Sequence, residues 1–440
     1  MPSIGSSVRP GRRESRLKTH LVLAATFAGL LLSERLYMRA GTGGRGMLPL
    51  MDLVMPLVGA WLVLSSGGKD LLRSMYQRQF VLWAPCFMLM AGLPVLGILV
   101  DGHPVRFIFG SLAGIRIFAL LMIGAWIGYR PEPLQAIARK YLIAAVVIEF
   151  SMAAIQYASV YGPGPIPLLK PIYDWDRTTQ LAWSSRYVIN GRSIGTFVNP
   201  NTLGFAGVLG FWVSALVLRG WMRRICVPLA LATVFFSQSR GSMFALGAGL
   251  LLWTAHLALT TKLRAARDVI FFGFVAMIPV MAWTAALGDR NGGSDSPILA
   301  RFGRGLLVLS EGSGADRNAD ARVEAWERAL SFYRTHSLGT WIEPQFLFGG
   351  YIDSDYVRLL LQGSAVSVFA FVLALYGGMR LIWLPATAGR LAAVFAAGLA
   401  VNSISATPLV YSVTGAYWLA CGFYLADEAG TRGGGRLTSV

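Results

Sequence analysis

The sequence contains few charged residues and very few cysteines. Of its 440 residues only 14% are charged, whereas about 25% is usual in soluble proteins. This scarcity excludes a soluble multi-domain enzyme, a disordered tail and a fibrous protein. The three cysteines, Cys86, Cys226 and Cys421, all lie in apolar runs, which excludes a disulfide framework. No C-x-x-C or H-E-x-x-H spacing is present, so we expect no metal and no cofactor.

The sequence is instead rich in long apolar runs. Hydrophobic residues make up 55% of the chain, and a membrane-spanning helix needs roughly 20 of them in a row. Because lipid offers no hydrogen-bond partners to the backbone, such runs must be helical. The predicted fold is therefore an all-α integral membrane protein with about twelve transmembrane helices, over residues 20–38, 47–64, 80–100, 105–128, 140–161, 197–218, 224–238, 241–259, 268–287, 356–377, 387–404 and 408–425.

The net charge of +17 comes from basic residues that lie between the apolar runs. They do not form one soluble patch, so the lipid bilayer explains them better than nucleic acid does. Every second connection is basic, which by the positive-inside rule predicts an inner-membrane protein with both termini cytoplasmic. The basic residues are Arg9, Arg12, Arg13, Arg16 and Lys18; Lys69, Arg73 and Arg78; Arg130, Arg139 and Lys140; Arg219, Arg223 and Arg224; Lys262, Arg264 and Arg267; Arg380 and Arg390; and Arg432 and Arg436.

Two long connections lie on the opposite, outer side of the predicted membrane. Long loops in compact proteins usually carry function. In the larger loop, Val323, Trp326, Leu330 and Tyr333 recur at helical spacing and predict an amphipathic helix over 320–333. The predicted organisation is a basic tail (1–19), helices one to nine (20–287) with an outer loop (162–196), a large periplasmic loop (288–355), helices ten to twelve (356–425) and a second tail (426–440).

Three polar motifs lie where predicted helices enter the membrane from the outer side. They are Arg192-Ser-Ile-Gly195-Thr-Phe-Val-Asn199-Pro200-Asn201, Ser237-Gln238-Ser239-Arg240-Gly241 and Asp353-Ser354-Asp355-Tyr356. Asn199 is an expected N-cap before a proline at the first helical position, and a serine can cap the second motif's helix. Helix starts carry partial positive charge and free N–H groups. With Arg192, Arg240 and Arg322 they predict a phosphate or pyrophosphate site.

The order of these motifs resembles the O-antigen ligase and polymerase superfamily, the multispanning glycosyltransferases of the bacterial envelope. The resemblance covers roughly residues 185–375 and includes Arg322-x-x-x-Trp326, G-G-x-x-D-S-D-Y and Gly363. It implies a C-type glycosyltransferase-like fold and metal-independent, inverting glycan transfer from undecaprenyl diphosphate. It also implies that Arg192, Arg240 and Arg322 contact the pyrophosphate, and that Asn199, Asn201, Ser239 and Tyr356 belong to the supporting motifs.

The acceptor hydroxyl needs a general base, for which Asp353 or Asp355 could serve. In the ligases that attach O-antigen to lipid A-core this position usually reads His-Asn. The Asp-Ser-Asp found here is more similar to the polymerases, so a polymerase is favoured over a ligase. The expected partners are an undecaprenyl-diphosphate-linked oligosaccharide, a glycan acceptor and the bilayer, with envelope-assembly proteins as a further candidate class.

Other interpretations stay open. Asp353 and Asp355 could only cap a helix, and Asp353-x-Asp355 also matches the D-x-D pattern of metal-dependent glycosyltransferases. A transporter or flippase could use the charges within the predicted spans as a path, although we expect Arg116 and Glu149 to pair. A structural scaffold for envelope assembly is the third class.

Overall fold

The structure is a computed structural model of the chain. It describes residues 20–26, 28, 30, 37–39, 47–64, 83, 85–86, 88–102, 112–128, 132–161, 188, 191–197, 199–260, 317–335, 340–341, 352–384, 387–406 and 414–433. The predicted tail 1–19, the predicted span 268–287 and most of the two outer loops lie outside these residues.

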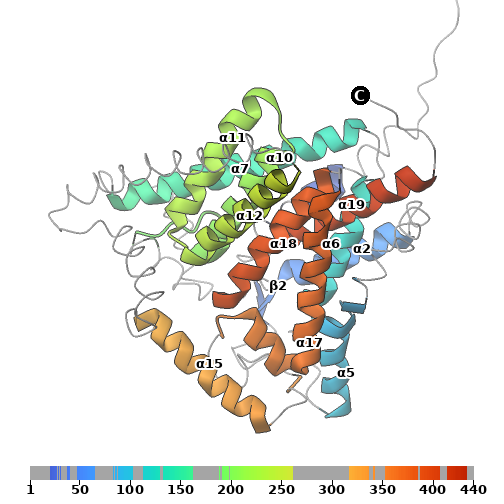
Figure 1. Ribbon diagram of the computed structural model, residues 1–440, viewed down its shortest axis with the longest axis vertical. Coiled ribbons are helices and arrows are strands. Elements are labelled where there is room, and N and C mark those ends of the chain that lie inside the picture. The colour runs from blue at the N-terminus through green and yellow to red at the C-terminus, as the bar shows by residue number, and fades with distance from the viewer. Residues whose placement is uncertain are drawn as a thin grey trace, which may run out of the picture.

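Helices make up most of the described chain, as expected (Figure 1). The longer ones are α2 (Leu50–Leu64), α6 (Leu112–Gly128), α7 (Glu132–Tyr161), α10 (Pro200–Leu216), α11 (Gly220–Ser237), α12 (Arg240–Leu259), α15 (Arg317–Thr335), α17 (Asp355–Met379), α18 (Thr387–Ser405) and α19 (Gly415–Gly433). The shorter ones are the π-helix η1 (Met88–Gly92), α5 (Leu93–Val100) and the 3-10 helix η5 (Arg380–Trp383).

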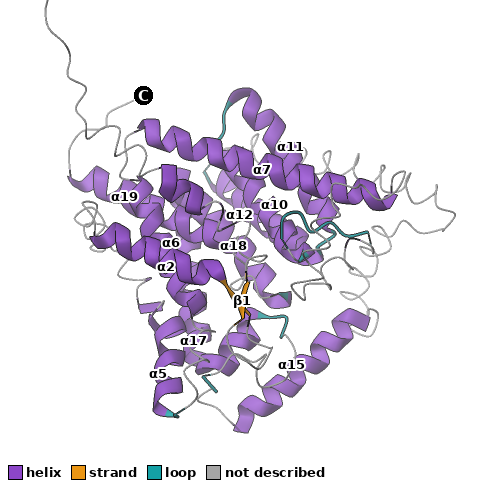
Figure 2. Ribbon diagram, turned by 180° about the vertical axis from the view of Figure 1, so that it is seen from behind, coloured by secondary structure: helices purple, strands orange, loops and turns teal. Residues whose placement is uncertain are grey.

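A short antiparallel hairpin interrupts the expected helical pattern near the N-terminus (Figure 2). In it β1 (Tyr37–Arg39) pairs with β2 (Met47–Pro49), so that Met38 faces Leu48. The prediction that 20–38 and 47–64 are helical throughout is therefore wrong at the end of the first range and the start of the second, where the strands lie. Four of the residues between the two strands are glycines, and glycine favours turns over helix.

Among the described residues, four helices are long and apolar enough to cross a membrane. They are Arg139–Ser159 within α7, Arg240–Leu259 (α12), Asp355–Trp383 (α17 with η5) and Thr387–Ile404 within α18. These helices support a membrane protein, whereas the count of about twelve spans stays a prediction.

Glycines allow the helices to pack closely. Where α6 meets α19, a Cβ on Gly124 would lie 2.3 Å from the Leu419 carbonyl oxygen, and a Cβ on Gly422 would lie 2.1 Å from that of Leu121. A larger residue at either position would force the backbones apart. Such small-residue contacts are how helices associate in membranes, where burial of apolar surface provides no driving force.

Helix α17 is broken near its start. Gly363 (φ −140°, ψ 24°) and Ser364 (φ 63°, ψ −174°) are non-helical, which frees the preceding carbonyls from the helix ladder. Backbone N–H groups of the large loop bind two of them, Thr340 to Leu361 (2.7 Å) and Trp341 to Gln362 (3.0 Å). Residues 365–383 after the break still provide the roughly 20 residues that a membrane span needs.

The amphipathic helix predicted over 320–333 is observed as α15. Its buried Ala329 packs with Ile352 and Leu361, and Trp326 lies against the same cluster. This contact fastens α15 to the first turns of α17, where the third polar motif lies.

Candidate functional site

Backbone and side-chain hydrogen bonds join the first two sequence motifs. The Ser193 N–H donates to the Phe236 carbonyl (3.0 Å), at the end of α11. From the turn after α11, Gln238 Nε2 donates to the Gly191 carbonyl (2.7 Å). Residues far apart in sequence thus form one layer at one end of the helices.

Arg192 is part of this junction and is only 8% exposed. Its Nε donates to the Ser237 carbonyl (3.3 Å) and its Nη2 to Asn201 Oδ1 (3.3 Å). Two acceptors on different helices fix the plane of the guanidinium group. The arginine of the first motif therefore lies against the turn from which Arg240 begins α12.

The helix starts of both motifs are capped as predicted. Asn199 caps α10 by accepting from the Asn201 N–H (2.8 Å), with Pro200 as the first helical residue. Ser239 caps α12 by accepting from the Ser242 N–H (3.3 Å). The Ser242 hydroxyl also donates to the Asn201 carbonyl (3.3 Å), which ties one helix start to the other.

The turn between α11 and α12 contains a strained residue. Gln238 ends α11 in the left-handed region (φ 50°, ψ 33°), where glycine or asparagine is usual. A side chain in this conformation costs roughly 1–2 kcal/mol. The hydrogen bond from Gln238 to Gly191 offsets part of that cost, and the turn sets the direction in which Ser239 and Arg240 enter α12.

Helix α7 holds the first motif from its other side. Gln156 Oε1 accepts from the N–H groups of Ile194 and Gly195 (2.8 Å each), and Gln156 Nε2 donates to the Gly195 carbonyl (2.9 Å). Glu149 accepts from the N–H (3.1 Å) and the hydroxyl of Thr196. Sequence analysis missed Gln156, because a polar residue within an apolar run gives no sign of its partner.

The expected Arg116–Glu149 ion pair stays a prediction. Helix α6 lies mainly against α19 and α2, whereas α7 lies mainly against α11 and α10. Glu149 serves the first motif. Gly195 has φ +61°, and a Cβ there would lie 2.3 Å from Glu149 Oε2, so only glycine fits.

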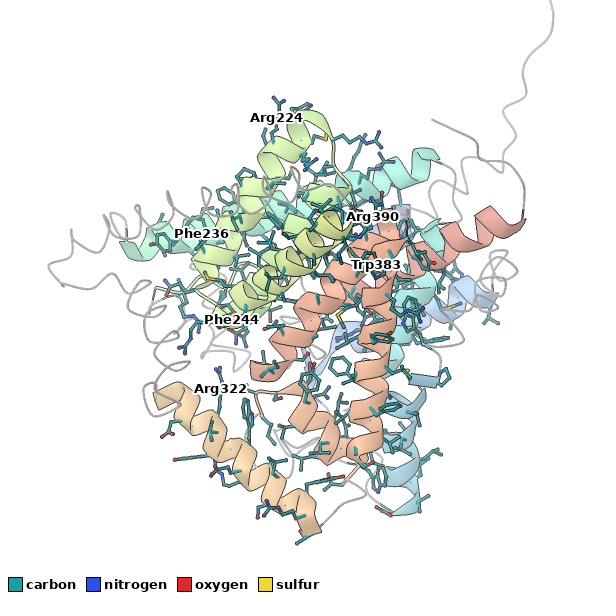
Figure 3. All side chains as sticks on the ribbon, viewed as in Figure 1. Arg224, Phe236, Phe244, Arg322, Trp383 and Arg390 are labelled. Carbon is teal, nitrogen blue, oxygen red and sulfur yellow. The ribbon has the colours of Figure 1, made fainter. Side chains whose placement is uncertain are left out.

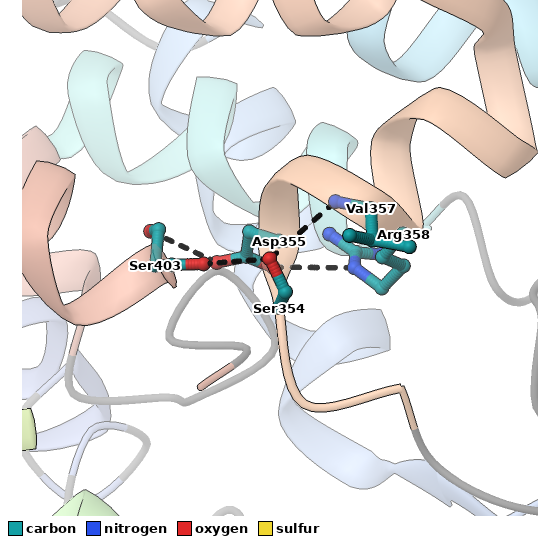
Figure 4. Close-up of polar contacts among 5 residues, drawn as sticks. All are labelled: Ser354, Asp355, Val357, Arg358 and Ser403. Atoms are coloured by element: carbon teal, nitrogen blue, oxygen red, sulfur yellow. Dashed lines mark hydrogen bonds and ion pairs between the residues drawn. The ribbon is translucent and has the colours of Figure 1, made fainter. Parts of the chain in front are cut away.

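The third motif begins α17, and Ser354 caps it by accepting from the Val357 N–H (3.4 Å) (Figure 4). Ser354 also donates to the Ser403 carbonyl on α18 (3.1 Å). Asp355 is fully buried, and it accepts from Arg358 Nε (3.2 Å) and from the Ser403 hydroxyl (3.3 Å). The Asp355-x-x-Arg358 spacing of a helical ion pair was visible in the sequence, but Arg358 was missed.

Asp353 and Asp355, our two candidate bases, lie in different environments. Asp353 pairs with Arg322 of α15 (Nε to Oδ2, 3.2 Å), and their side chains are 45% and 30% exposed. The Tyr356 hydroxyl of the same motif donates to the Ala400 carbonyl (3.0 Å). Arg322 is thus joined to the third motif, and Asp353 is the candidate base that an incoming molecule can reach.

Helix α18 connects the third motif to the second. Its Ser403 binds Asp355, while its other side packs along α12, where a Cβ on Gly398 would lie 3.3 Å from the Ala245 carbonyl oxygen. Near the last turn of α12, the ring of His256 lies 5.4 Å from that of Trp383 in η5, a few residues before α18 begins. The two helices are therefore antiparallel, and the starts of α12 and α17 both lie at the end of α18.

Basic residues lie at the opposite end of the helices. In Figure 3, Arg224 and Arg390 lie at the upper end, whereas Arg322 lies at the lower end. Arg224 lies in the first turns of α11, and Arg390 donates to the Leu384 carbonyl between α17 and α18 (3.2 Å). Basic connections and polar motifs thus occupy different ends of the same helices.

No known protein family, curated protein or solved structure matches the chain. The chemistry of the site follows from its own groups. Helix starts and guanidinium groups attract an anion and hold it in place. The exposed carboxylate of Asp353 can accept a proton from a group bound beside that anion.

Proposed function

We propose that the protein is a polysaccharide polymerase of the bacterial inner membrane. It transfers a glycan from undecaprenyl diphosphate to an acceptor sugar hydroxyl at the periplasmic face, without a metal and with inversion. The observation that carries the proposal is the hydrogen-bonded junction of Arg192 with the turn that leads into Arg240, at the starts of α10 and α12. About twelve spans with both termini cytoplasmic are part of the proposal.

The proposed reaction is a single displacement. Asp353 takes the proton of the acceptor hydroxyl, whose oxygen attacks the anomeric carbon from the side opposite the diphosphate. The bond between that carbon and the phosphate oxygen breaks, and the diphosphate leaves with the electron pair. Arg192 and Arg240 stabilise the charge that develops on it, because arginine stays protonated and binds phosphate oxygens in pairs.

Two alternatives use the same end of the molecule. An O-antigen ligase would transfer the glycan to lipid A-core, so only the acceptor would differ. A transporter or flippase is favoured by one observation, the break of α17 at Gly363 and Ser364, because interrupted helices line substrate sites in many transporters.

The test is to replace the two arginines in a strain that lacks the chromosomal gene. Arg192→Ala and Arg240→Ala should each lower polymer formation by roughly a hundredfold or more, and undecaprenyl-diphosphate repeat units should accumulate. Because Arg192 is buried, Arg192→Lys is measured as well, and it should also fail if paired contacts are needed. Lipid-linked saccharides and polymer length are measured at equal protein level.

The matched control is Arg223→Ala, an exposed arginine at the opposite end of the helices, which should behave like wild type. Normal polymer from Arg192→Ala and Arg240→Ala would contradict the proposal. Loss of lipid-linked repeat units from the outer leaflet in a strain without the protein would favour the flippase.

A further inference from the structure

Asn402 is a polar residue of α18 to which nothing above gives a role. Its side chain is fully buried, and neither Nδ2 nor Oδ1 has a hydrogen-bond partner within the described chain. An unsatisfied buried polar group destabilises the folded state. Such a group calls for an explanation.

The position of Asn402 follows from the packing of α18 on α12. Gly398 lies one helical turn before Asn402 on the same face, and it contacts Ala245. Because the two helices are antiparallel, one turn further along α18 corresponds to one turn back along α12, which is Gly241. Asn402 therefore faces the first turn of α12, beside Arg240.

Asn402 also lies close to the third motif. The next residue, Ser403, is hydrogen-bonded to both Ser354 and Asp355. The amide is thus between the starts of α12 and α17, at the end of the helices where Arg192 lies. The start of α12, which carries Arg240, therefore has a buried amide without a hydrogen-bond partner beside it.

The chemistry of an amide indicates what it would bind there. Nδ2 donates and Oδ1 accepts hydrogen bonds, and both are without a partner in the described residues. A phosphate at neutral pH mainly accepts, so it would satisfy only Nδ2. A sugar with neighbouring hydroxyl groups can donate and accept, and so it satisfies both atoms.

We propose that Asn402 binds the sugar that is attached directly to the diphosphate, while Arg240 and the start of α12 bind the diphosphate itself. This inference rests on the proposed function and assigns a sugar-recognising residue to the same site. Asn402 would then increase the affinity for lipid diphosphate that carries a sugar over that for lipid diphosphate without one.

The test compares two ligands of the purified full-length protein in detergent, undecaprenyl diphosphate and undecaprenyl diphosphate linked to one hexose. Asn402→Leu should lower affinity for the hexose-bearing lipid about tenfold, the size of a lost hydrogen-bonded contact, and leave affinity for the sugar-free lipid unchanged. Its unfolding temperature without ligand should rise, because an unsatisfied amide is replaced by an apolar group of similar size.

Ser214→Ala is the matched control, because Ser214 is also a buried polar group without a partner in the described chain but lies near the other end of α10. It should change neither affinity. Asn402→Ala is measured as well. For each variant the ratio of its affinities for the two lipids is compared, because this ratio does not depend on the fraction of protein that is folded. The role of Asn402 would be overturned if the wild type bound both lipids with equal affinity. It would also be overturned if Asn402→Leu lost affinity for both lipids equally. If the wild type binds neither lipid, the proposed function itself fails.

Discussion

At the scale of single residues, Asp353 and Asp355 show how environment separates two carboxylates of one motif. Asp355 is enclosed by Arg358 and Ser403 and stabilises the contact of α17 with α18. Removing one member of a buried ion pair typically costs about 3–5 kcal/mol. Asp353 has only a half-exposed contact with Arg322, and such a pair is worth about 1 kcal/mol or less. The third motif thus contains one structural and one accessible carboxylate.

This difference predicts an unusual result for Asp353→Asn. Glycan transfer should be lost because the base is gone, whereas affinity for sugar-free undecaprenyl diphosphate should rise about two- to fivefold. The reason is that Arg322 no longer has a competing carboxylate. Binding and single-turnover transfer are measured on the same purified protein.

Arg322→Ala is the control for this competition and should lower the same affinity. Weaker binding of the diphosphate by Asp353→Asn would mean that Asp353 does not compete for Arg322. Normal transfer by Asp353→Asn would instead exclude it as the base.

At the scale of helices, the contact of α10 with the α11–α12 turn positions the arginine junction. A Cβ on Gly204 would lie 2.5 Å from Ser237 Oγ and 2.6 Å from Ser242 Oγ. Both serines take part in the hydrogen bonds of the turn. The turn can therefore keep its position only while residue 204 has no side chain.

Gly204→Ala should therefore lower transfer at least about tenfold, because sub-ångström displacement of positioning groups is costly in catalysis. Gly247→Ala on α12 is the matched control, since a Cβ there would meet no atom of the described chain within 4 Å. It should leave transfer unchanged and stabilise the protein by up to about 1 kcal/mol. Equal activity of both variants would show that the turn tolerates displacement.

The helices also show how far sequence reasoning reaches. Asn199 and a serine of the second motif were predicted as helix caps, because a capping side chain satisfies N–H groups only a few residues away. At the third motif Asp353 and Asp355 were considered as caps, whereas the cap observed is Ser354. The role of Gln156 and the break of α17 were not predictable, because their hydrogen bonds join residues far apart in sequence. For the same reason the burial of Asp355 could not be predicted from its motif. Interactions between residues close in sequence could be predicted, whereas hydrogen bonds between residues far apart in sequence could not.

At the scale of the whole molecule, basic residues of the helix connections and the polar motifs lie at opposite ends of the described helices. Arg223 and Arg224 lie in the first turns of α11, away from the junction of Arg192 with the α11–α12 turn. The positive-inside rule then predicts that the first end is cytoplasmic and the second periplasmic. The sequence predicted this separation because loop charge needs no tertiary information.

The orientation can be tested by cysteine labelling, because the three native cysteines are all buried and should react little. Glu324 is exposed on α15 and Arg223 is exposed at the start of α11. In intact spheroplasts a membrane-impermeant maleimide should label the Glu324→Cys variant, whereas the Arg223→Cys variant should react only after permeabilisation. The wild-type protein measures background, and retained polymer formation shows that each variant is folded. The reverse labelling pattern would place the arginine junction in the cytoplasm, where lipid-linked glycans are made rather than polymerised, and the proposed reaction could not occur there.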